Sequence, residues 1–154
     1  MDIDNTQDTL DSRDIIEKID ELQGERETIM DELNELKKEL EKAMSGDETK
    51  KIKDNITERE VELKEWDELE GDDLKALKDL AEQCEGYSDW EHGEQLIRDS
   101  YFKEYAQELA EDIGAIDKDA QWPNTCIDWD EATEQLQQDY MCVDFDEVEY
   151  WIRI

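Results

Sequence analysis

The chain has 154 residues, of which 49 are Asp or Glu and 17 are Lys or Arg, so its formal net charge is −32. A charge of about 2 to 8 is enough to keep a small domain in solution, so the excess needs a functional reason. The charge argues against direct binding of nucleic acid, which requires clustered basic residues, and against binding to an anionic membrane. Partners with basic surfaces remain.

The composition also predicts a folded, cytoplasmic chain. Disorder fits poorly, because twelve aromatic residues are present, only one Pro occurs, and apolar residues recur at helical spacing. No apolar run approaches the roughly 20 residues that span a bilayer, and no secretory signal follows Met1. Cys84, Cys126 and Cys142 are widely spaced and odd in number, which predicts reduced thiols.

The first half of the chain has the pattern of a long amphipathic helix. Residues 1 to 10 are polar and expected to be frayed, and a helix is predicted from Asp11 or Ser12 to about residue 44. Arg26 fills the one break in its heptad seam. The apolar positions of the seam are Ile15, Ile19, Leu22, Ile29, Leu33, Leu36, Leu40 and Ala43.

A second helix is predicted after a stop and a new cap at Ser45-Gly46-Asp47. Its apolar face holds Ile52, Ile56, Leu63 and Trp66, and Arg59 fills its break. The short connection predicts an antiparallel helical hairpin over residues 11 to 70, although both helices could instead join a dimeric coiled coil. A homodimer is therefore one possible state.

Residues 71 to 154 are predicted to form a compact acidic α+β domain, because most of the aromatic residues follow Gly71. Gly71-Asp72-Asp73 predicts the start of a third helix ending near Gly86. A short strand is expected at Gln95 to Arg98, and a further helix from Ser100 to Ile113. The inward positions of that helix are expected to be Tyr101, Phe102, Tyr105, Leu109 and Ile113.

The C-terminal end is predicted to add one more helix and a β-hairpin. Asp128 with Glu131 three residues later makes a capping-box-like helix start. Alternating apolar residues from Met141 onward predict two strands joined by a turn at Asp146-Glu147. The fold class is thus mainly α with a small α+β C-terminal part: an N-terminal helical hairpin or coiled coil, then a compact acidic domain ending in a β-hairpin.

Charge is distributed unevenly. Bases gather between residues 37 and 64, whereas residues 99 to 154 hold 16 acids and 3 bases. B-DNA carries one negative charge per about 1.7 Å of axis, and carboxylates about 5 to 6 Å apart on helices approximate that field. We therefore predict a surface that imitates DNA and blocks a basic DNA-binding protein. The predicted surface residues are Glu104, Glu108, Glu111, Asp112, Asp117, Asp119, Asp130, Glu131, Glu134, Asp139, Asp144, Asp146 and Glu147.

This part of the chain resembles the final part of ArdA-type antirestriction proteins. In that family a helix ending in Gly-Ala precedes a loop with Pro, an Ile-Asp-aromatic helix start and a terminal hairpin. The resemblance covers residues 99 to 154, and the heptad-rich first half has no counterpart in it. The matching segments are Tyr101 to Ile116, Ile127-Asp128-Trp129-Asp130-Glu131-Ala132, Leu136 with Asp139-Tyr140, and Glu149-Tyr150-Trp151.

The resemblance implies a phage or mobile-element protein that evades host defence in the cytoplasm of a bacterial host cell. Such proteins occupy the DNA site of type I restriction–modification enzymes. An anti-CRISPR inhibitor of a Cas effector fits the same charge, since that target also has a basic DNA channel. Two further alternatives are an acidic coiled-coil structural adaptor, whose charge only keeps it soluble, and an acidic chaperone for a basic protein.

The sequence offers little support for an enzyme, a cofactor or a metal site. It has no Gly-rich phosphate loop and no CxxC or HExxH spacing, and its one histidine, His92, is expected to be structural or exposed. Calcium loops starting at Asp117 or Asp128 fail, because Trp122 or Thr133 stands where Gly is needed. Cys126 and Cys142 are expected to be small buried residues. Six aromatic residues are expected in the core: Trp90, Trp122, Trp129, Tyr140, Tyr150 and Trp151.

Overall fold

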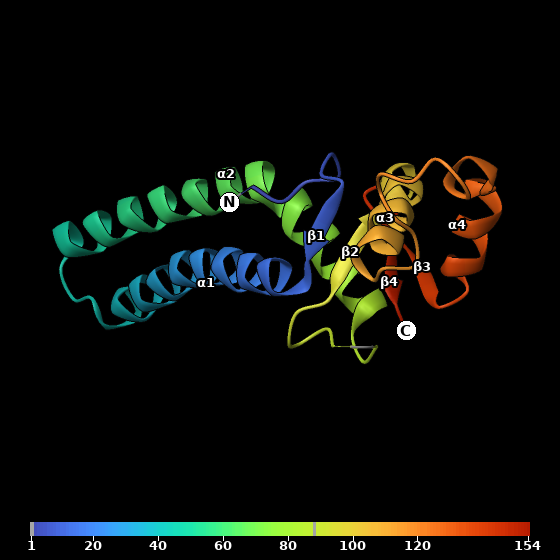
Figure 1. Cartoon of the computed structure of the whole chain (residues 1–154). Coiled ribbons are helices and arrows are strands. Elements are labelled where there is room, and N and C mark those ends of the chain that lie inside the picture. The colour runs from blue at the N-terminus through green and yellow to red at the C-terminus, as the bar shows by residue number, and fades with distance from the viewer. Residues whose placement is uncertain (1, 88) are drawn as a thin grey trace. The chain divides into compact units, whose positions relative to one another are not determined.

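The computed structural model describes residues 2–87 and 89–154 (Figure 1). It is mainly helical with a small antiparallel sheet, which confirms the predicted fold class. The chain divides into two compact units: residues 17–78, here called the arm, and residues 1–16 with 79–154, here called the sheet unit. The elements are β1 (Thr9–Asp11), α1 (Ser12–Lys42), α2 (Gly46–Cys84), β2 (Gln95–Arg98), α3 (Asp99–Asp112), η1 (Asn124–Cys126), α4 (Trp129–Gln137), β3 (Tyr140–Phe145) and β4 (Val148–Arg153).

The arm is the predicted antiparallel pair of helices, α1 and α2 (Figure 1). Its apolar seam lies between the helices as the heptad pattern predicted. Leu33, Ile52 and Ile56 form a buried cluster, and partly buried seam residues pack against it: Leu36, Leu40, Ala43 and Leu63. The connection follows the predicted stop and cap, since the Ser45 hydroxyl accepts a hydrogen bond from the backbone N–H of Glu48 at 3.1 Å. Burial of one apolar stripe from each helix therefore holds the arm together.

Polar pairs cross between the helices where arginines interrupt the seam. Arg26 Nε lies 2.7 Å from Asp67 Oδ1, and the guanidinium holds the pKa of that carboxyl below its usual value. Arg59 lies 3.3 Å from Glu32. Exposed ion pairs of this kind add little stability, but each fixes which residues of the two helices face one another.

The predicted break at Gly71 is wrong, because α2 continues through it to Cys84. A single glycine inside a helix costs only about 1 kcal/mol relative to alanine. Leu74, Leu77 and Leu80 continue the buried stripe beyond it, so packing outweighs this cost. The predicted boundary between residues 70 and 71 thus falls inside a helix, and the two compact units divide between Lys78 and Asp79.

The sheet unit contains four antiparallel strands in the order β1-β2-β4-β3. The prediction that residues 1 to 10 are frayed is wrong for the last two of them, because Thr9 pairs with Ile97 and Leu10 with Leu96. Leu10 is only 4% exposed, so β1 adds an apolar side chain as well as backbone hydrogen bonds. The Tyr150 hydroxyl also donates to the carbonyl of Gln7 at 2.6 Å.

Helix α3 covers one face of the sheet with an aromatic cluster. The Phe102 ring lies edge-on to Tyr140 and Trp151, with ring centroids 5.1 and 5.9 Å away. The hydroxyls of Tyr105 and Tyr140 lie 2.9 Å apart. The opposite face holds Leu96 and Ile152, which are cross-strand partners and fully buried.

The C-terminal end of α2 is joined to the edge strand β3. The Gln83 side-chain amide donates to the Asp144 carbonyl at 2.9 Å, and its oxygen accepts from the Asp144 N–H at 2.9 Å. The next residue, Cys84, is fully buried, and this burial raises its pKa to about 12. The Cys84 thiol is therefore protonated at neutral pH and packs as a small apolar group.

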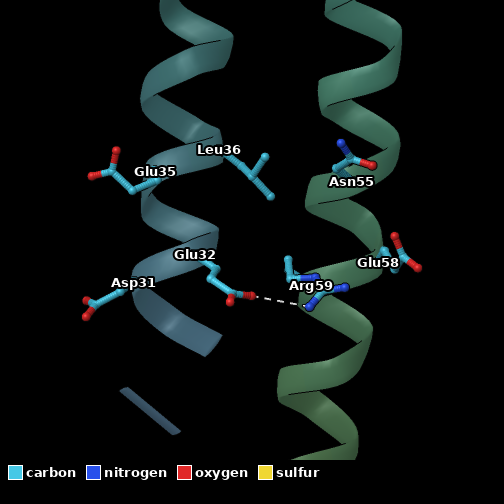
Figure 2. A pocket seen from close by; sticks show the side chains of 7 residues that line it. All are labelled: Asp31, Glu32, Glu35, Leu36, Asn55, Glu58 and Arg59. Carbon is cyan, nitrogen blue, oxygen red and sulfur yellow. Dashed lines mark hydrogen bonds and ion pairs between the residues drawn. The ribbon is translucent and has the colours of Figure 1, made fainter. Parts of the chain in front are cut away.

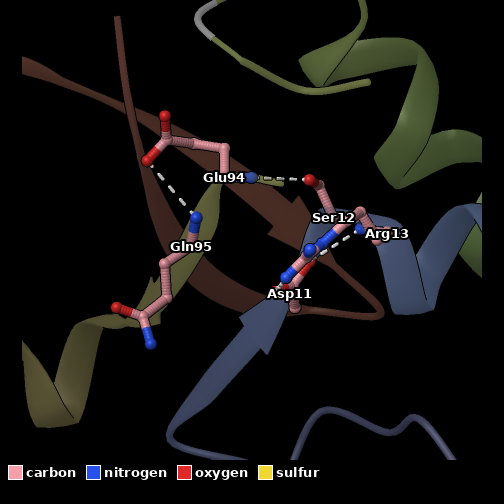
Figure 3. A network of polar contacts seen from close by, with 5 residues as sticks. All are labelled: Asp11, Ser12, Arg13, Glu94 and Gln95. Atoms are coloured by element: carbon pink, nitrogen blue, oxygen red, sulfur yellow. Dashed lines mark hydrogen bonds and ion pairs between the residues drawn. The ribbon is translucent and has the colours of Figure 1, made fainter. Parts of the chain in front are cut away.

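Ser12 joins the start of α1 to the residue before β2 (Figure 3). Its hydroxyl accepts from the Glu94 N–H at 2.7 Å, and its own N–H donates to the Glu94 carbonyl at 2.9 Å. Ser12 is completely buried. Beside it, Gly93 has φ +112°, and a Cβ there would lie 2.7 Å from Arg13 Nε. The contact between the start of α1 and the residue before β2 therefore depends on the small side chain of Ser12 and on the absence of a Cβ at Gly93.

We predict that Ser12→Ala lowers the free energy of unfolding of the sheet unit by about 1 to 3 kcal/mol, because it removes the completely buried hydroxyl that accepts from the Glu94 N–H at 2.7 Å. Ser100→Ala, at an exposed serine, is the control and should change it by less than about 0.5 kcal/mol. Urea denaturation followed by tryptophan fluorescence measures both. Equal effects of the two substitutions would contradict the role given to Ser12.

Candidate functional site

The two units differ in how their charge is balanced. The sheet unit holds 27 acids and 5 bases, a net charge of −22, whereas the arm holds 22 acids and 12 bases, a net charge of −10. Within the part of the chain that the structure describes, most ion pairs lie in the arm. The sheet unit therefore carries most of the uncompensated negative charge, as predicted for residues 99 to 154.

Helix α3 carries a dense row of carboxylates. Glu104, Glu108 and Asp112 are spaced four residues apart and exposed, while Glu111 beside them is half-buried. These four groups span about 12 Å of helix axis, or one per about 4 Å. One strand of B-DNA carries one phosphate per about 3.4 Å, so the linear densities are similar. Glu108 accepts a hydrogen bond from the Tyr101 hydroxyl at 2.9 Å, which raises the pKa of that tyrosine.

Helix α4 adds a second acidic segment. Its predicted start is confirmed, since the Asp128 carboxylate accepts from the Glu131 N–H at 3.2 Å. The side chains of Asp130, Glu131 and Glu134 are exposed. Asp130 lies 2.8 Å from Lys103 Nζ, and this ion pair links α4 to α3. Asp139 is exposed just after the helix.

The connection from α3 to α4 contains Asp117 and Asp119, both exposed. Its backbone folds back on itself, because Asn124 Nδ2 donates to the Asp117 carbonyl at 2.6 Å. Two residues expected in the core are instead exposed: Trp122 by 78% and Ile113 by 70%. Their residue types predicted burial, but the structure leaves both side chains open to solvent.

The turn between β3 and β4 holds Asp146 and Glu147 at φ 48° and 67°. These left-handed conformations confirm the predicted turn and suit Asn-Gly or Asp-Gly. A non-glycine residue there costs about 1 to 2 kcal/mol. The Asp144 carboxylate accepts from the Glu147 N–H at 3.2 Å, which supports the turn. The chain thus keeps a carboxylate at Glu147, where the backbone favours glycine.

The end of α3 is also unfavourable for its acids. Glu111 and Asp112 occupy the last turn, which contains no basic residue. Negative charge at a helix C-terminus is disfavoured by the helix dipole. Gly114, with φ +75°, follows the helix as predicted. Several predicted surface residues therefore stand where they oppose local stability.

The structure brings the thirteen predicted surface residues into one unit and leaves twelve of them exposed and Glu111 half-buried. It also adds a residue that sequence reasoning missed. The Asp8 carbonyl accepts a hydrogen bond from the N–H of Arg98, the N-cap of α3, at 2.8 Å, so the N-terminal segment brings the charge of Asp8 close to the start of that helix. The signal was the Thr9-Leu10 pair, which is typical of a strand and argued against fraying.

The cysteine expectations are wrong for two residues, since Cys126 and Cys142 are exposed. Across residues 2–87 and 89–154, no group of three or more His, Cys, Asp and Glu is arranged to hold a metal ion. None of the helices in the same residues has an apolar stretch long enough to cross a membrane.

The arm has a groove of about 510 Å³ between its helices (Figure 2). Leu36 projects from α1 toward α2 in this view, and Arg59 lies opposite Glu32. Carboxylates outnumber the single base around this groove. Its lining residues are Asp31, Glu32, Glu35, Leu36, Asn55, Glu58 and Arg59.

Comparison of the chain with protein-family models, with curated proteins and with solved structures finds no match.

We predict that Glu147→Gly raises the free energy of unfolding by about 0.5 to 1 kcal/mol, because glycine adopts the left-handed conformation without a Cβ clash. Glu147→Ala is the matched control, since it removes the same charge but keeps the strained backbone. Thermal and urea unfolding measure both variants. If alanine stabilises as much as glycine, the gain comes from lost repulsion and not from the backbone.

Proposed function

We propose that this protein is a DNA-mimic anti-defence inhibitor that occupies the DNA-binding site of a restriction–modification enzyme. The observation that carries the proposal is that surface carboxylates stand where they oppose local stability. Glu111 and Asp112 lie against the dipole of α3, and Glu147 lies in a turn that favours glycine. Residues kept at a cost to stability are commonly kept for function.

The mechanism is competition for a basic groove. A DNA-binding enzyme holds phosphates with Lys and Arg, and the acids of α3 and α4 offer it a similar linear density of negative charge. Because few bases interrupt this surface, its field steers the two proteins together and gives binding that weakens steeply with salt. The inhibitor needs no chemical step, since occupancy of the groove excludes DNA.

The same charge would fit the DNA channel of a Cas effector, which is the second target class. That channel and a restriction–modification groove both bind nucleic acid backbones. Inhibition assays with one enzyme of each class separate the two targets, since only the enzyme that the protein targets should lose activity. Added duplex DNA should relieve this inhibition.

We predict that Glu111→Lys with Asp112→Lys weakens inhibition by about tenfold or more, since close charge pairs dominate such interfaces. The same variant should raise the midpoint of thermal unfolding, because bases replace acids at a helix C-terminus. Inhibition of DNA cleavage and differential scanning calorimetry measure the two effects.

The matched control is Glu39→Lys with Glu41→Lys, which changes the same charge near the end of α1 in the arm. We expect it to leave inhibition within about twofold of the wild type, since long-range charge effects are largely screened at physiological salt. If both variants lose inhibition equally, net charge alone is responsible and the proposed surface is wrong.

The groove of the arm favours a second candidate function, an acidic coiled-coil adaptor. In that case Leu36→Asp should abolish assembly with a partner or a second copy, because it places a charge on the apolar floor of the groove. Leu69→Asp is the control, since Leu69 is 76% exposed on α2. Sedimentation velocity and the same inhibition assay distinguish the two candidate functions. If the protein is an adaptor, Leu36→Asp should lose assembly and Leu69→Asp should keep it. If the protein is a DNA mimic, both variants should inhibit as well as the wild type.

A further inference from the structure

One feature of the sheet unit does not serve charge mimicry. Trp122 is 78% exposed and Ile113 is 70% exposed. They are the two most exposed large apolar side chains of that unit within the described residues. Both lie in the connection between α3 and α4, among the predicted surface residues.

The backbone that carries Trp122 is held in place. The Thr125 N–H donates to the Gln121 carbonyl at 2.8 Å, and the Cys126 N–H donates to the Pro123 carbonyl at 2.8 Å. The short helix η1 follows directly. The indole is therefore presented from ordered turns, so little further ordering is required when a partner covers it.

The surroundings of Trp122 along the chain are acidic. Asp117 and Asp119 precede it, Asp128 follows it, and Lys118 is the one base between α3 and α4. A flat two-ring side chain thus projects from a segment rich in negative charge. This combination matches a nucleotide whose base has left the stack, where a flat ring projects from a charged backbone.

Enzymes that modify DNA bases create that arrangement themselves. They turn the target base out of the duplex and bind it in a pocket between aromatic or apolar side chains. An indole is similar in size and flatness to a purine and has one N–H donor. Tryptophan is also among the residues that most often dominate binding energy at protein interfaces.

We propose that Trp122 imitates an extruded base and enters the base-binding pocket of a DNA-modifying enzyme while the carboxylates occupy its phosphate groove. This inference rests on the proposed function and narrows the partner to base-flipping enzymes, such as the methyltransferase part of a restriction–modification system. The acids supply salt-dependent attraction, and the indole supplies contact that salt does not screen.

The test is a salt titration of binding between the whole protein and the purified methyltransferase core of a type I restriction–modification enzyme. Trp122→Ala should weaken binding by about tenfold at every salt concentration without changing the slope of log Kd against log salt. Trp122→Phe should recover part of the loss. The control, Asp117→Asn with Asp119→Asn, should reduce the slope instead. Because Trp122 is exposed, these substitutions leave the fold intact, which circular dichroism verifies.

A competition experiment tests the pocket. A free purine nucleoside has no phosphate and can enter a base pocket without filling the groove, so it should weaken binding of the wild type and leave binding of Trp122→Ala unchanged. Unchanged affinity of Trp122→Ala, or equal effects of the nucleoside on both proteins, would overturn the base imitation while leaving the charge mimicry intact. Absence of any binding that DNA displaces would overturn the proposed function and this inference together.

Discussion

Mutual repulsion of carboxylates is the force that the sheet unit has to withstand, since it carries a net charge of −22. Apolar burial opposes it. Leu96, Tyr150 and Ile152 are completely buried in the sheet, and Phe102 closes the opposite face against Tyr140 and Trp151. Aromatic side chains each remove a large area from water, so a few of them offset much repulsion. The charge can remain unneutralised because this core of aliphatic and aromatic side chains opposes the repulsion.

The arm reaches stability differently. Its acids are accompanied by bases, and Arg26 and Arg59 pair with Asp67 and Glu32 across the two helices. Such a surface is typical of an ordinary solvated coiled coil. The two units therefore differ in charge compensation. The acids of the arm are balanced in part by bases, whereas the sheet unit carries more negative charge than folding requires.

Local patterns predicted the parts of the fold that depend on local interactions. Heptad spacing in α1 and α2, the Asp128 cap of α4 and the turn at Asp146-Glu147 are each determined by residues within a few positions. The errors lie where distant contacts decide. β1 has three residues and exists because Leu10 meets Leu96, 86 positions away.

The remaining differences between expectation and structure also depend on the assembled fold. α2 continues through Gly71 because Leu74 and Leu77 pack beyond it. Exposure of Trp122 depends on what the fold leaves uncovered, which residue type alone does not reveal. The uneven distribution of charge along the sequence predicted which carboxylates would be exposed. Only the structure shows that some of them lie against the helix dipole or in a left-handed turn.

The pairing of β1 with β2 makes the arm an insertion, since the sheet unit contains chain from both before and after it. A single proteolytic cut at residues 43–45 would therefore not release a fragment. The N-terminal piece would stay attached through the β1–β2 hydrogen bonds, the Ser12–Glu94 pair and the Tyr150–Gln7 bond. Both chain segments that lead into the arm are thus held by the sheet, and a nicked protein would keep its acidic surface assembled.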